Sequence, residues 1–309
     1  MTDCNESQAN RERIRRQASL LLADFENELL NDDLRVKVIS LVPVFHELRK
    51  LGKSLLPVAL STAARDRILY YLKKYQGMVI HGDEIMVVSG IQEYARRIRE
   101  LRVQFGWEIM SGIAVNDMSK AGEEEIPEEL SSMKPNEYVL MIPEPDREAA
   151  HRWNTANAIR KGGGAVRDKI LKFLRQNVGR EVTNEELRYV AGNKTEWARR
   201  VRELRTEFGW PIASKSTGLP DLRVGVYVLQ ADRQSYEHDR SIPDPVRREV
   251  LRRDKYACQR CDWSHQEWNP DDPRHLELHH VVHHAAGGEN TEYNLITLCT
   301  ICHDQEHKH

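Results

Sequence analysis

The sequence has no apolar run long enough to cross a bilayer and no recognisable signal peptide at its start, which excludes a helical membrane protein. Its formal net charge is only −2, so binding of nucleic acid by overall positive charge is excluded as well. The 309 residues, 40% hydrophobic and 30% charged, are those of ordinary globular domains and are enough for two or three of them. We therefore expect a cytoplasmic protein without membrane contact.

Cysteine is also scarce, with five residues in the whole chain. Four of the five lie in the last stretch, 255–309, as two Cys-x-x-Cys pairs made by Cys258, Cys261, Cys299 and Cys302. Two such pairs supply the four thiolates of a closed tetrahedral zinc site, which is structural because it leaves no open position. The alternative of two disulfides needs an oxidising compartment, and nothing in the sequence points to one.

Histidine is concentrated in the same stretch: nine of the thirteen histidines follow Asp262. The pattern predicts a strand at 276–282, a turn-rich loop, a second strand at 294–299 and a short helix after it. His303 and His307 share one face of that helix because they are four residues apart. With a histidine from the first strand they could hold one divalent ion with positions left open, although surface histidines of a zinc finger remain the alternative.

These residues resemble an HNH, or ββα-metal, endonuclease over the last ~60 residues, including the lead-in IPDPVRREVLRRDKYACQRC. The resemblance implies that His279 and His303 bind the catalytic metal and that His307 is a further ligand. It implies that His280 is the general base and that Asn294 braces the loop so that His280 is oriented. The four cysteines match the zinc-stapled branch of the family.

The chemistry agrees with that resemblance. Hydrolysis of a phosphodiester needs a base that titrates near neutral pH, which histidine supplies, and a cation such as Mg²⁺ to neutralise developing charge. Two points stay open. Neighbours on a regular strand face opposite ways, so His279 and His280 need a twisted strand end to serve one site. His283 or His284 could also take a role assigned here to a neighbour.

The first 58 residues predict two amphipathic helices separated by a break at 31–33 that offers an N-cap, with Pro43 expected to kink or split the second. Two helices cannot bury both apolar faces in so short a segment. We expect them to pack on the next domain or on a second protomer, and the sequence does not separate these alternatives.

An internal repeat follows: residues 64–109 align with 166–212, with ARRIRELR against ARRVRELR and FGW in both. Each copy predicts two helices, a glycine turn at Gly90 or Gly192, a long arginine-rich helix and two strands. The strands are expected at 107–115 and 137–142 in the first copy, and at 210–216 and 224–229 in the second. This order resembles a winged helix-turn-helix.

The third helix of each copy has one apolar face and one polar face. The polar faces carry the candidate DNA-contacting residues Gln92, Arg96, Arg99, Thr195, Arg199 and Arg202. Arginine near a helix N-terminus suits contact with guanine or phosphate, whereas the alternative is a solvated face of Arg–Glu pairs. The acidic run 123–129 in the first copy should point away from DNA or touch another protein surface, which makes the second copy, with its short wing, the better candidate for base reading.

The sequence thus predicts a mainly α protein with α+β modules. We expect a helical segment at 1–58, winged-helix domains at 59–145 and 165–232, a linker at 146–164 and a zinc-stapled HNH nuclease domain at 233–309. The expected function is a sequence-targeted DNA endonuclease with structural zinc and a catalytic divalent ion, a restriction enzyme acting on double-stranded DNA as a homodimer.

Dependence on 5-methylcytosine is a further hypothesis, made by analogy with restriction enzymes that join winged helices to a nuclease. Two alternatives remain open at this stage. One is a DNA-binding regulator whose zinc module is only structural, and the other is a nicking or homing-type endonuclease.

Overall fold

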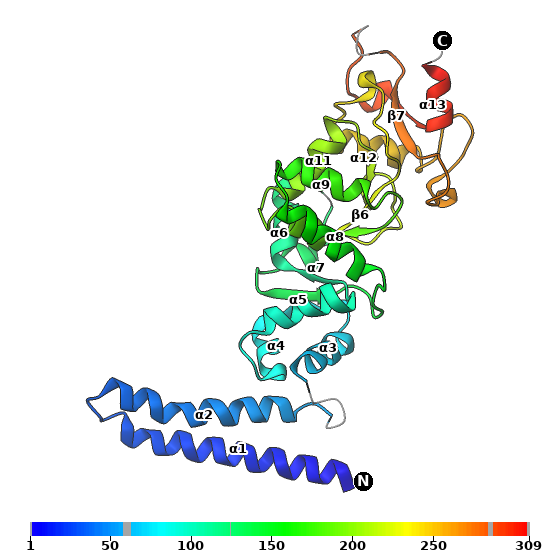
Figure 1. Cartoon of the computed structure of the whole chain (residues 1–309). Coiled ribbons are helices and arrows are strands. Elements are labelled where there is room, and N and C mark those ends of the chain that lie inside the picture. Colours follow the sequence, from blue (N-terminus) through cyan, green and yellow to red (C-terminus); the bar gives the residue numbers. More distant parts are fainter. Residues whose placement is uncertain (1, 58–62, 124, 284–286, 308–309) are drawn as a thin grey trace. The chain divides into compact units, whose positions relative to one another are not determined.

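The computed structural model describes residues 2–57, 63–123, 125–283 and 287–307 (Figure 1). The chain is mainly helical and forms two compact units, Met1–Ile109 with Asn136–Ala149 and Met110–Pro135 with Ala150–His309. In the part of the chain described, every helix is too short or too polar to span a membrane. The two units interleave along the sequence, because residues between the two segments of the first unit belong to the second.

The helices and short sheets follow one another in a simple order along the chain. The elements are α1 (Thr2–Glu28), α2 (Leu34–Ser54), α3 (Ala64–Lys74), β1 (Ile80–His81), α4 (Gly82–Ser89), α5 (Tyr94–Phe105), β2 (Ile109–Ser111), α6 (Gly112–Ala121), α7 (Glu128–Ser131), β3 (Glu137–Leu140), α8 (Ala149–Lys161), α9 (Val166–Arg175), β4 (Val182–Thr183), α10 (Asn184–Val190), α11 (Trp197–Thr206), β5 (Ile212–Ala213), β6 (Val226–Leu229), η2 (Glu237–Asp239), α12 (Asp244–Arg253), η3 (His265–Glu267), β7 (Leu276–His280), η5 (Glu292–Asn294), β8 (Leu295–Cys299) and α13 (Thr300–Glu306).

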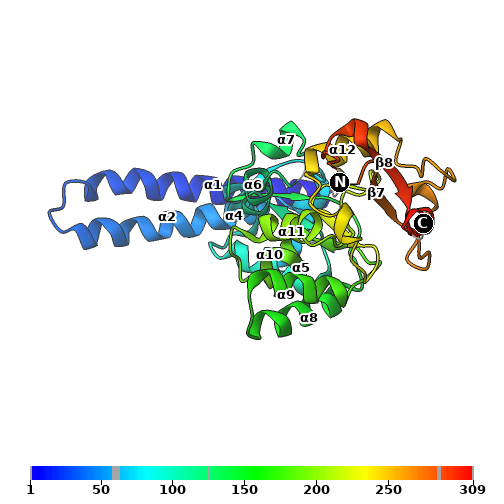
Figure 2. The ribbon, with the colours of Figure 1, turned by 90° about the horizontal axis from the view of Figure 1, so that it is seen from above.

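The N-terminal helices α1 and α2 lie side by side as a hairpin in both views of the ribbon (Figures 1 and 2). Asp33 caps α2, as predicted, by accepting a hydrogen bond from the backbone N–H of Arg35 at 2.8 Å. The expectation that Pro43 splits the helix is wrong, because α2 runs unbroken through it. Pro43 is exposed, and neighbouring turns keep the helix continuous around its missing N–H.

The two repeats build the same local structure twice. Each has a three-stranded sheet, of order β1-β3-β2 in the first and β4-β6-β5 in the second. Gly77 and Gly179 both have positive φ and donate their N–H to the last residue of the central strand, Leu140 or Leu229. An arginine lies over the aromatic ring near the end of the third helix in both copies, as Arg65 over Phe105 and Arg167 over Phe208. The duplication seen in the sequence is therefore a duplication of structure.

The repeats differ between their second and third strands. The sequence predicted a strand continuing to residue 115 in the first copy, but the strand ends at Ser111 and the helix α6 begins at Gly112. Ser111 caps that helix through Ala114, and Gly122 ends it in the left-handed conformation with φ 62°. The prediction was wrong because the apolar residues at 113–115 fit a strand as well as a helix, and these caps decide for the helix.

The inserted segment α6–α7 packs on the second repeat within the same compact unit. The backbone N–H and hydroxyl of Ser111 donate to Glu185 at 2.9 and 2.5 Å. Asp117 accepts from the indole of Trp197 at 3.1 Å and pairs with Arg188 at 3.3 Å. These buried polar contacts specify one docking position for the segment.

The acidic end of the insertion meets the lead-in helix of the C-terminal module. Arg205 of α11 is buried and pairs with Asp244 of α12 at 2.6 Å and with Glu123 at 2.8 Å. Arg248 donates to the carbonyl oxygens of Gly122 and Glu123, and Arg252 pairs with Glu125. The acidic run therefore contacts a protein surface, one of the two outcomes that the sequence left open for it.

The C-terminal module is a β-hairpin followed by a helix. Strand β7 pairs antiparallel with β8, so that His279 lies opposite Ile296 and His280 opposite Leu295. Helix α13 begins directly after β8 and packs on both strands, and α12 packs on β8 from the preceding segment. The order strand, loop, strand, helix agrees with the sequence prediction. It brings both strand histidines and the helix histidines to one side of the module.

Candidate metal centre and nuclease site

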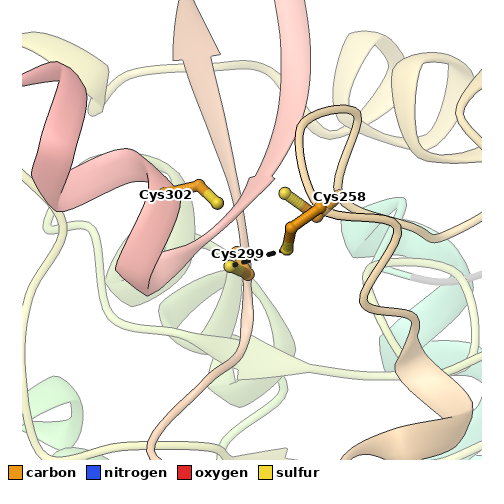
Figure 3. A group of neighbouring side chains, drawn as sticks. Cys258, Cys299 and Cys302 are labelled. Atoms are coloured by element: carbon orange, nitrogen blue, oxygen red, sulfur yellow. Dashed lines mark hydrogen bonds between the residues drawn. The ribbon is translucent and has the colours of Figure 1, made fainter.

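The four cysteines of the C-terminal module converge at one point, and Figure 3 shows three of them, Cys258, Cys299 and Cys302. Cys258 and Cys261 come from a tight turn, and Cys299 and Cys302 come from the end of β8 and the start of α13. The sulfur atoms of Cys261 and Cys299 are 3.7 Å apart. That separation is far longer than a disulfide and matches the edge of a tetrahedron with metal–sulfur bonds of about 2.3 Å. The cluster thus has the shape of a structural zinc site.

The electrostatics of the thiols also fit a cation. Burial raises the pKa of Cys258, but backbone N–H groups at Cys299, Arg260 and Cys261 outweigh it and hold the pKa below the usual range. Burial and the three neighbouring thiols raise the pKa of Cys302 far above the usual range. Four thiolates this close repel one another unless a positive ion lies among them, which is what a bound zinc ion supplies.

A second group of ligand atoms lies in the same module and consists of Asp239, His279, His303 and His307, all within 4.8 Å of one another. The three histidines are those that the sequence singled out, from β7, α13 and its C-terminal end. The Nε2 atoms of His303 and His307 face each other at 3.1 Å. The Nδ1 atom of His279 is buried without a hydrogen-bond partner. Imidazole nitrogens that converge in this way fit a divalent cation between them.

Asp239 was not predicted. It lies at the end of η2, about 40 residues before His279, in a part of the expected nuclease domain where the sequence offered no candidate ligand. Its Oδ2 atom is 2.7 Å from His303 Nε2 and 2.8 Å from His307 Nε2, while its Oδ1 atom is 2.8 Å from His280 Nδ1. The buried carboxylate therefore joins the candidate metal ligands to the candidate base. No local motif distinguishes it from the other acidic residues around it.

His280 is fully buried between two side chains. Its Nδ1 atom faces Asp239, and its Nε2 atom lies 2.8 Å from the side-chain oxygen of Asn290. Its backbone N–H also donates to Asp239 at 3.1 Å. His279 lies near the same carboxylate, with Nδ1 at 3.6 Å from Oδ2. His279 and His280, although neighbours on one strand, thus reach the same site because both approach the carboxylate of Asp239.

Asn294 stabilises the loop after β7 through hydrogen bonds of its side chain and backbone. Its side-chain oxygen accepts from the N–H of Val282 at 2.8 Å, and its amide nitrogen donates to the carbonyl oxygens of Val282 and Glu289 at 3.0 and 3.1 Å. The backbone adds a bond from Val281 N–H to Asn294 carbonyl oxygen. These contacts hold the chain immediately beyond His280.

Outer contacts orient the metal-binding histidines. Glu277 Oε2 is 2.6 Å from His303 Nδ1, and Glu277 Oε1 is 3.2 Å from His275 Nε2. A carboxylate on the far ring nitrogen fixes the orientation of a histidine ligand and increases its basicity. Burial lowers the pKa of His303, but the carboxylates of Asp239 and Glu277 outweigh burial and raise it to about 9. Burial raises the pKa of Asp239, and its histidine partners outweigh this and hold it well below its usual range.

The residues predicted to contact DNA differ from one another in exposure and in their contacts with the rest of the protein. Arg96 and Arg99 are exposed on α5, whereas Gln92 is exposed but lies before the start of this helix, and Thr195 likewise lies before the start of α11, so neither is on the helix face where the sequence placed it. Thr195 and Arg199 are also exposed, and Arg199 pairs with Glu203 at 3.0 Å. The polar face of the second copy is therefore partly occupied by protein.

Arg202 shows this most clearly. It is half-buried, and its guanidinium donates to the carbonyl oxygen of Ala121 in the inserted segment. The structure thus assigns Arg202 a contact within the protein, where the sequence suggested a contact with DNA. The preference for the second copy as base reader loses one of its residues.

Of the two further histidines, His283 is exposed and its ring centroid lies 5.7 Å from that of His279 and 6.0 Å from that of His307. It stands at the open edge of the candidate metal centre. His284 lies outside the described residues.

Both the repeats and the C-terminal module match known protein families. The profile of the HNH endonuclease family matches residues 258–309. The profile of the KpnI N-terminal domain matches residues 65–141 and 167–230, which are the two repeats. The C-terminal module is therefore an HNH endonuclease domain, and the two repeats before it are similar to the KpnI N-terminal domain.

A more particular likeness is to the type IV methyl-directed restriction enzyme EcoKMcrA of Escherichia coli (strain K12). The two proteins are 28% identical over 122 residues, which are 36% of this chain and 43% of that protein. The alignment thus spans less than half the length of the relative. No solved structure gives a significant match.

Proposed function

We propose that the chain is a DNA restriction endonuclease in which the HNH domain hydrolyses phosphodiester bonds and the repeats direct it to its site. The observation that carries this is the convergence of Asp239, His279, His303 and His307 beside His280 in a domain of the HNH family. A zinc-stapled regulator has no use for a second, histidine-rich cluster. The likeness to a methyl-directed restriction enzyme supports the same conclusion.

In this proposal the chain's own residues divide the work. His279, His303, His307 and Asp239 would hold a divalent ion, and three imidazoles with one carboxylate suit a transition-metal ion better than Mg²⁺. The ion would supply charge neutralisation at the phosphate and leaving oxygen. Asp239 holds one proton of His280 on Nδ1, and Nε2 accepts a proton from the attacking water once it has lost the proton that it shares with the side-chain oxygen of Asn290. That water takes the place at Nε2 that the side chain of Asn290 holds. Asn294 keeps the loop after His280 in position, and the four cysteines hold structural zinc.

We infer that each repeat is a winged helix-turn-helix, with α5 and α11 as the recognition helices. The support is the order of three helices and a three-stranded sheet, with the third helix following a left-handed glycine at Gly90 or Gly192. The proposed contacts to double-stranded DNA are Arg96 and Arg99 of α5, Arg199 of α11, and the residues just before these helices, Gln92 and Thr195.

Dependence on 5-methylcytosine is the narrower proposal, supported by the methyl-directed relative. One HNH centre cuts one strand, so we propose a homodimer for double-strand cleavage. A restriction role puts the enzyme in the cytoplasm, where the cluster thiols stay reduced.

The deciding experiment is cleavage of supercoiled plasmid with Mg²⁺ or Mn²⁺, on cytosine-methylated and unmethylated DNA, with wild type beside His280→Ala. We expect cutting by wild type and loss of it in the variant, with zinc content and DNA binding unchanged. Equal cutting of both plasmids would refute the dependence on methylation alone. DNA binding without any cutting would refute the nuclease and favour the regulator.

A further inference from the structure

The N-terminal hairpin leaves most of its apolar side chains in solvent. Only a few are buried in it, chiefly Ile14, Ala18 and Val44. On α2, Leu34, Val38, Phe45 and Leu48 are all exposed. At 100° per residue these four positions fall on one face of the helix, which we call the α2 stripe. A stripe of this kind on a water-soluble helix marks a surface that another element covers.

Exposed apolar residues are also present on the facing helix of the hairpin. Leu22 of α1 and Leu29, just beyond its end, are seven residues apart and both exposed. Val42 and Ile39 widen the apolar surface on α2. Two helices with this much outward apolar surface are half of a helical bundle, because a four-helix bundle needs an apolar face on each member.

The charges of the hairpin are divided along its length. The distal half, residues 20–42, carries five carboxylates and two cationic side chains, a net charge of −3. The proximal half, residues 2–19 and 43–57, carries seven cationic side chains and four carboxylates, a net charge of +3. A second hairpin lying antiparallel places its acidic half on the basic half of the first, and the reverse. Only a self-complementary surface of this kind satisfies a two-fold axis.

We propose that the hairpin is the dimerisation element of this protein, and that two copies pair antiparallel through the α2 stripe into a four-helix bundle. The identity of the occupant as a second copy rests on this charge complementarity, and on the proposed function, which needs two HNH centres for two strands. The stem of the hairpin stays with the first repeat, since Gly52 packs against the backbone of Val87 in α4. The dimer contact is thereby connected to a recognition domain.

The test is sedimentation velocity of the full chain at micromolar concentration without DNA or divalent metal. We expect a dimer for wild type and a monomer for Val38→Glu with Phe45→Glu, since burying two unpaired charges weakens the dimer by about 100-fold or more. The control, Gln17→Glu with Asn27→Glu, adds the same charge at exposed positions off the stripe and should remain a dimer. Circular dichroism checks that helix content is kept in both.

Charge reversal tests the antiparallel arrangement. Glu26→Lys, on the face of α1 that carries the exposed Leu22 and Leu29, should weaken the dimer, and adding Arg15→Glu on the same face should restore it. A parallel pairing predicts no rescue and would overturn the arrangement. A monomeric wild type, whether the stripe is covered by the rest of the chain or by another protein in the cell, would overturn the inference.

Plasmid cleavage separates this inference from the proposed function. If both hold, the stripe variant nicks plasmid but linearises it far more slowly than wild type. If wild type is monomeric and still cleaves DNA, the nuclease proposal is supported and the hairpin dimer is refuted. If wild type is a dimer, the stripe variant is a monomer and neither protein cleaves DNA, the hairpin dimer is supported and the nuclease proposal is refuted.

Discussion

Asp239 is the residue on which the candidate site depends most. A single carboxylate contacts three histidines, two through Oδ2 and one through Oδ1. It adds negative charge to the metal centre and fixes the tautomer of the base at the same time. The sequence pointed to the histidines because they cluster, whereas Asp239 becomes visible only when η2 is folded against β7.

We predict that Asp239→Asn lowers the affinity for Mn²⁺ by about 10–100-fold, the range seen when a group that supports a metal site is lost. The amide keeps the size of the side chain, so fold and zinc content should be unchanged. Isothermal titration with Mn²⁺ measures the effect, and Asp232→Asn, which alters an exposed pair with Arg175, is the matched control. Unchanged Mn²⁺ affinity would exclude Asp239 from the metal centre.

The cysteine cluster makes a separate prediction at the same scale. Cys258→Ser should remove one equivalent of zinc and lower the midpoint of thermal unfolding, because structural zinc binding contributes directly to folding. Cys4→Ser, at the one cysteine far from the cluster in sequence, should change neither. Zinc content by atomic absorption and a thermal melt decide the matter, and a zinc-free wild type with two disulfides would refute the site.

Among the elements, helix α11 has a structural role in addition to any role in DNA reading. Its Arg205 is buried between Glu123 of the insertion and Asp244 of α12. A guanidinium shared by two carboxylates joins three segments that are far apart in sequence. The orientation of the HNH domain relative to the second repeat depends on this cluster.

Arg205→Met should therefore cost about 3–5 kcal/mol, because it leaves two buried carboxylates without a cation. The loss of unfolding free energy is measured by urea unfolding of the second unit, followed by the fluorescence of its tryptophans. Arg199→Met, which removes an exposed arginine from the same helix, should cost less than about 1 kcal/mol. Equal effects of the two substitutions would contradict the role given to the buried cluster.

The same cluster predicts acid sensitivity. Burial raises the pKa of Asp244, but Arg205 outweighs it and holds the pKa below its ordinary value. A carboxylate with a lowered pKa stabilises the fold above its unfolded pKa of about 3.9, and this contribution is lost as pH falls through the folded value. Between pH 5 and 3, about the window of this loss, the free energy of unfolding should fall less steeply in Asp244→Asn than in wild type. Parallel pH profiles would argue against the cluster.

Some helices, strands and contacts of this protein could be predicted from the sequence, and others could not. The repeats, the strand–strand–helix order of the nuclease and the clustering of its cysteines and histidines could be predicted because each has a local signal. Helix α6 was missed because its apolar residues fit either structure, and its caps and its docking on Trp197 decide. The contact of Arg202 with Ala121 could not be predicted, because Ala121 lies about 80 residues away in an insertion that the second repeat lacks.

At the scale of the whole molecule, the two compact units do not correspond to two continuous stretches of chain. Residues 110–135 leave the first repeat between its strands β2 and β3 and complete the second unit. The insertion covers buried groups of the second repeat, among them Glu185 and Trp197. The second repeat therefore lacks part of its core without this segment.

We predict that a fragment of residues 110–309 folds cooperatively and that a fragment of residues 150–309 does not, because the shorter one exposes Glu185, Trp197 and Arg205. Near-ultraviolet circular dichroism and the cooperativity of urea unfolding distinguish the two. Adding the peptide 110–135 to the shorter fragment should restore the signal. A well-folded short fragment would refute the dependence.

The interleaved chain also affects the order of events during synthesis. As the polypeptide leaves the ribosome, residues 110–135 emerge before any of their partners in the second repeat, the nearest of which lies about 70 residues later. Contacts this distant in sequence form slowly, because a long loop must close first. The nuclease domain is made after the repeats, and its lead-in helix is held by Glu123 and Arg205 only after the insertion has docked. A ribosome that stops early thus releases repeats without a nuclease, and never a nuclease without its repeats.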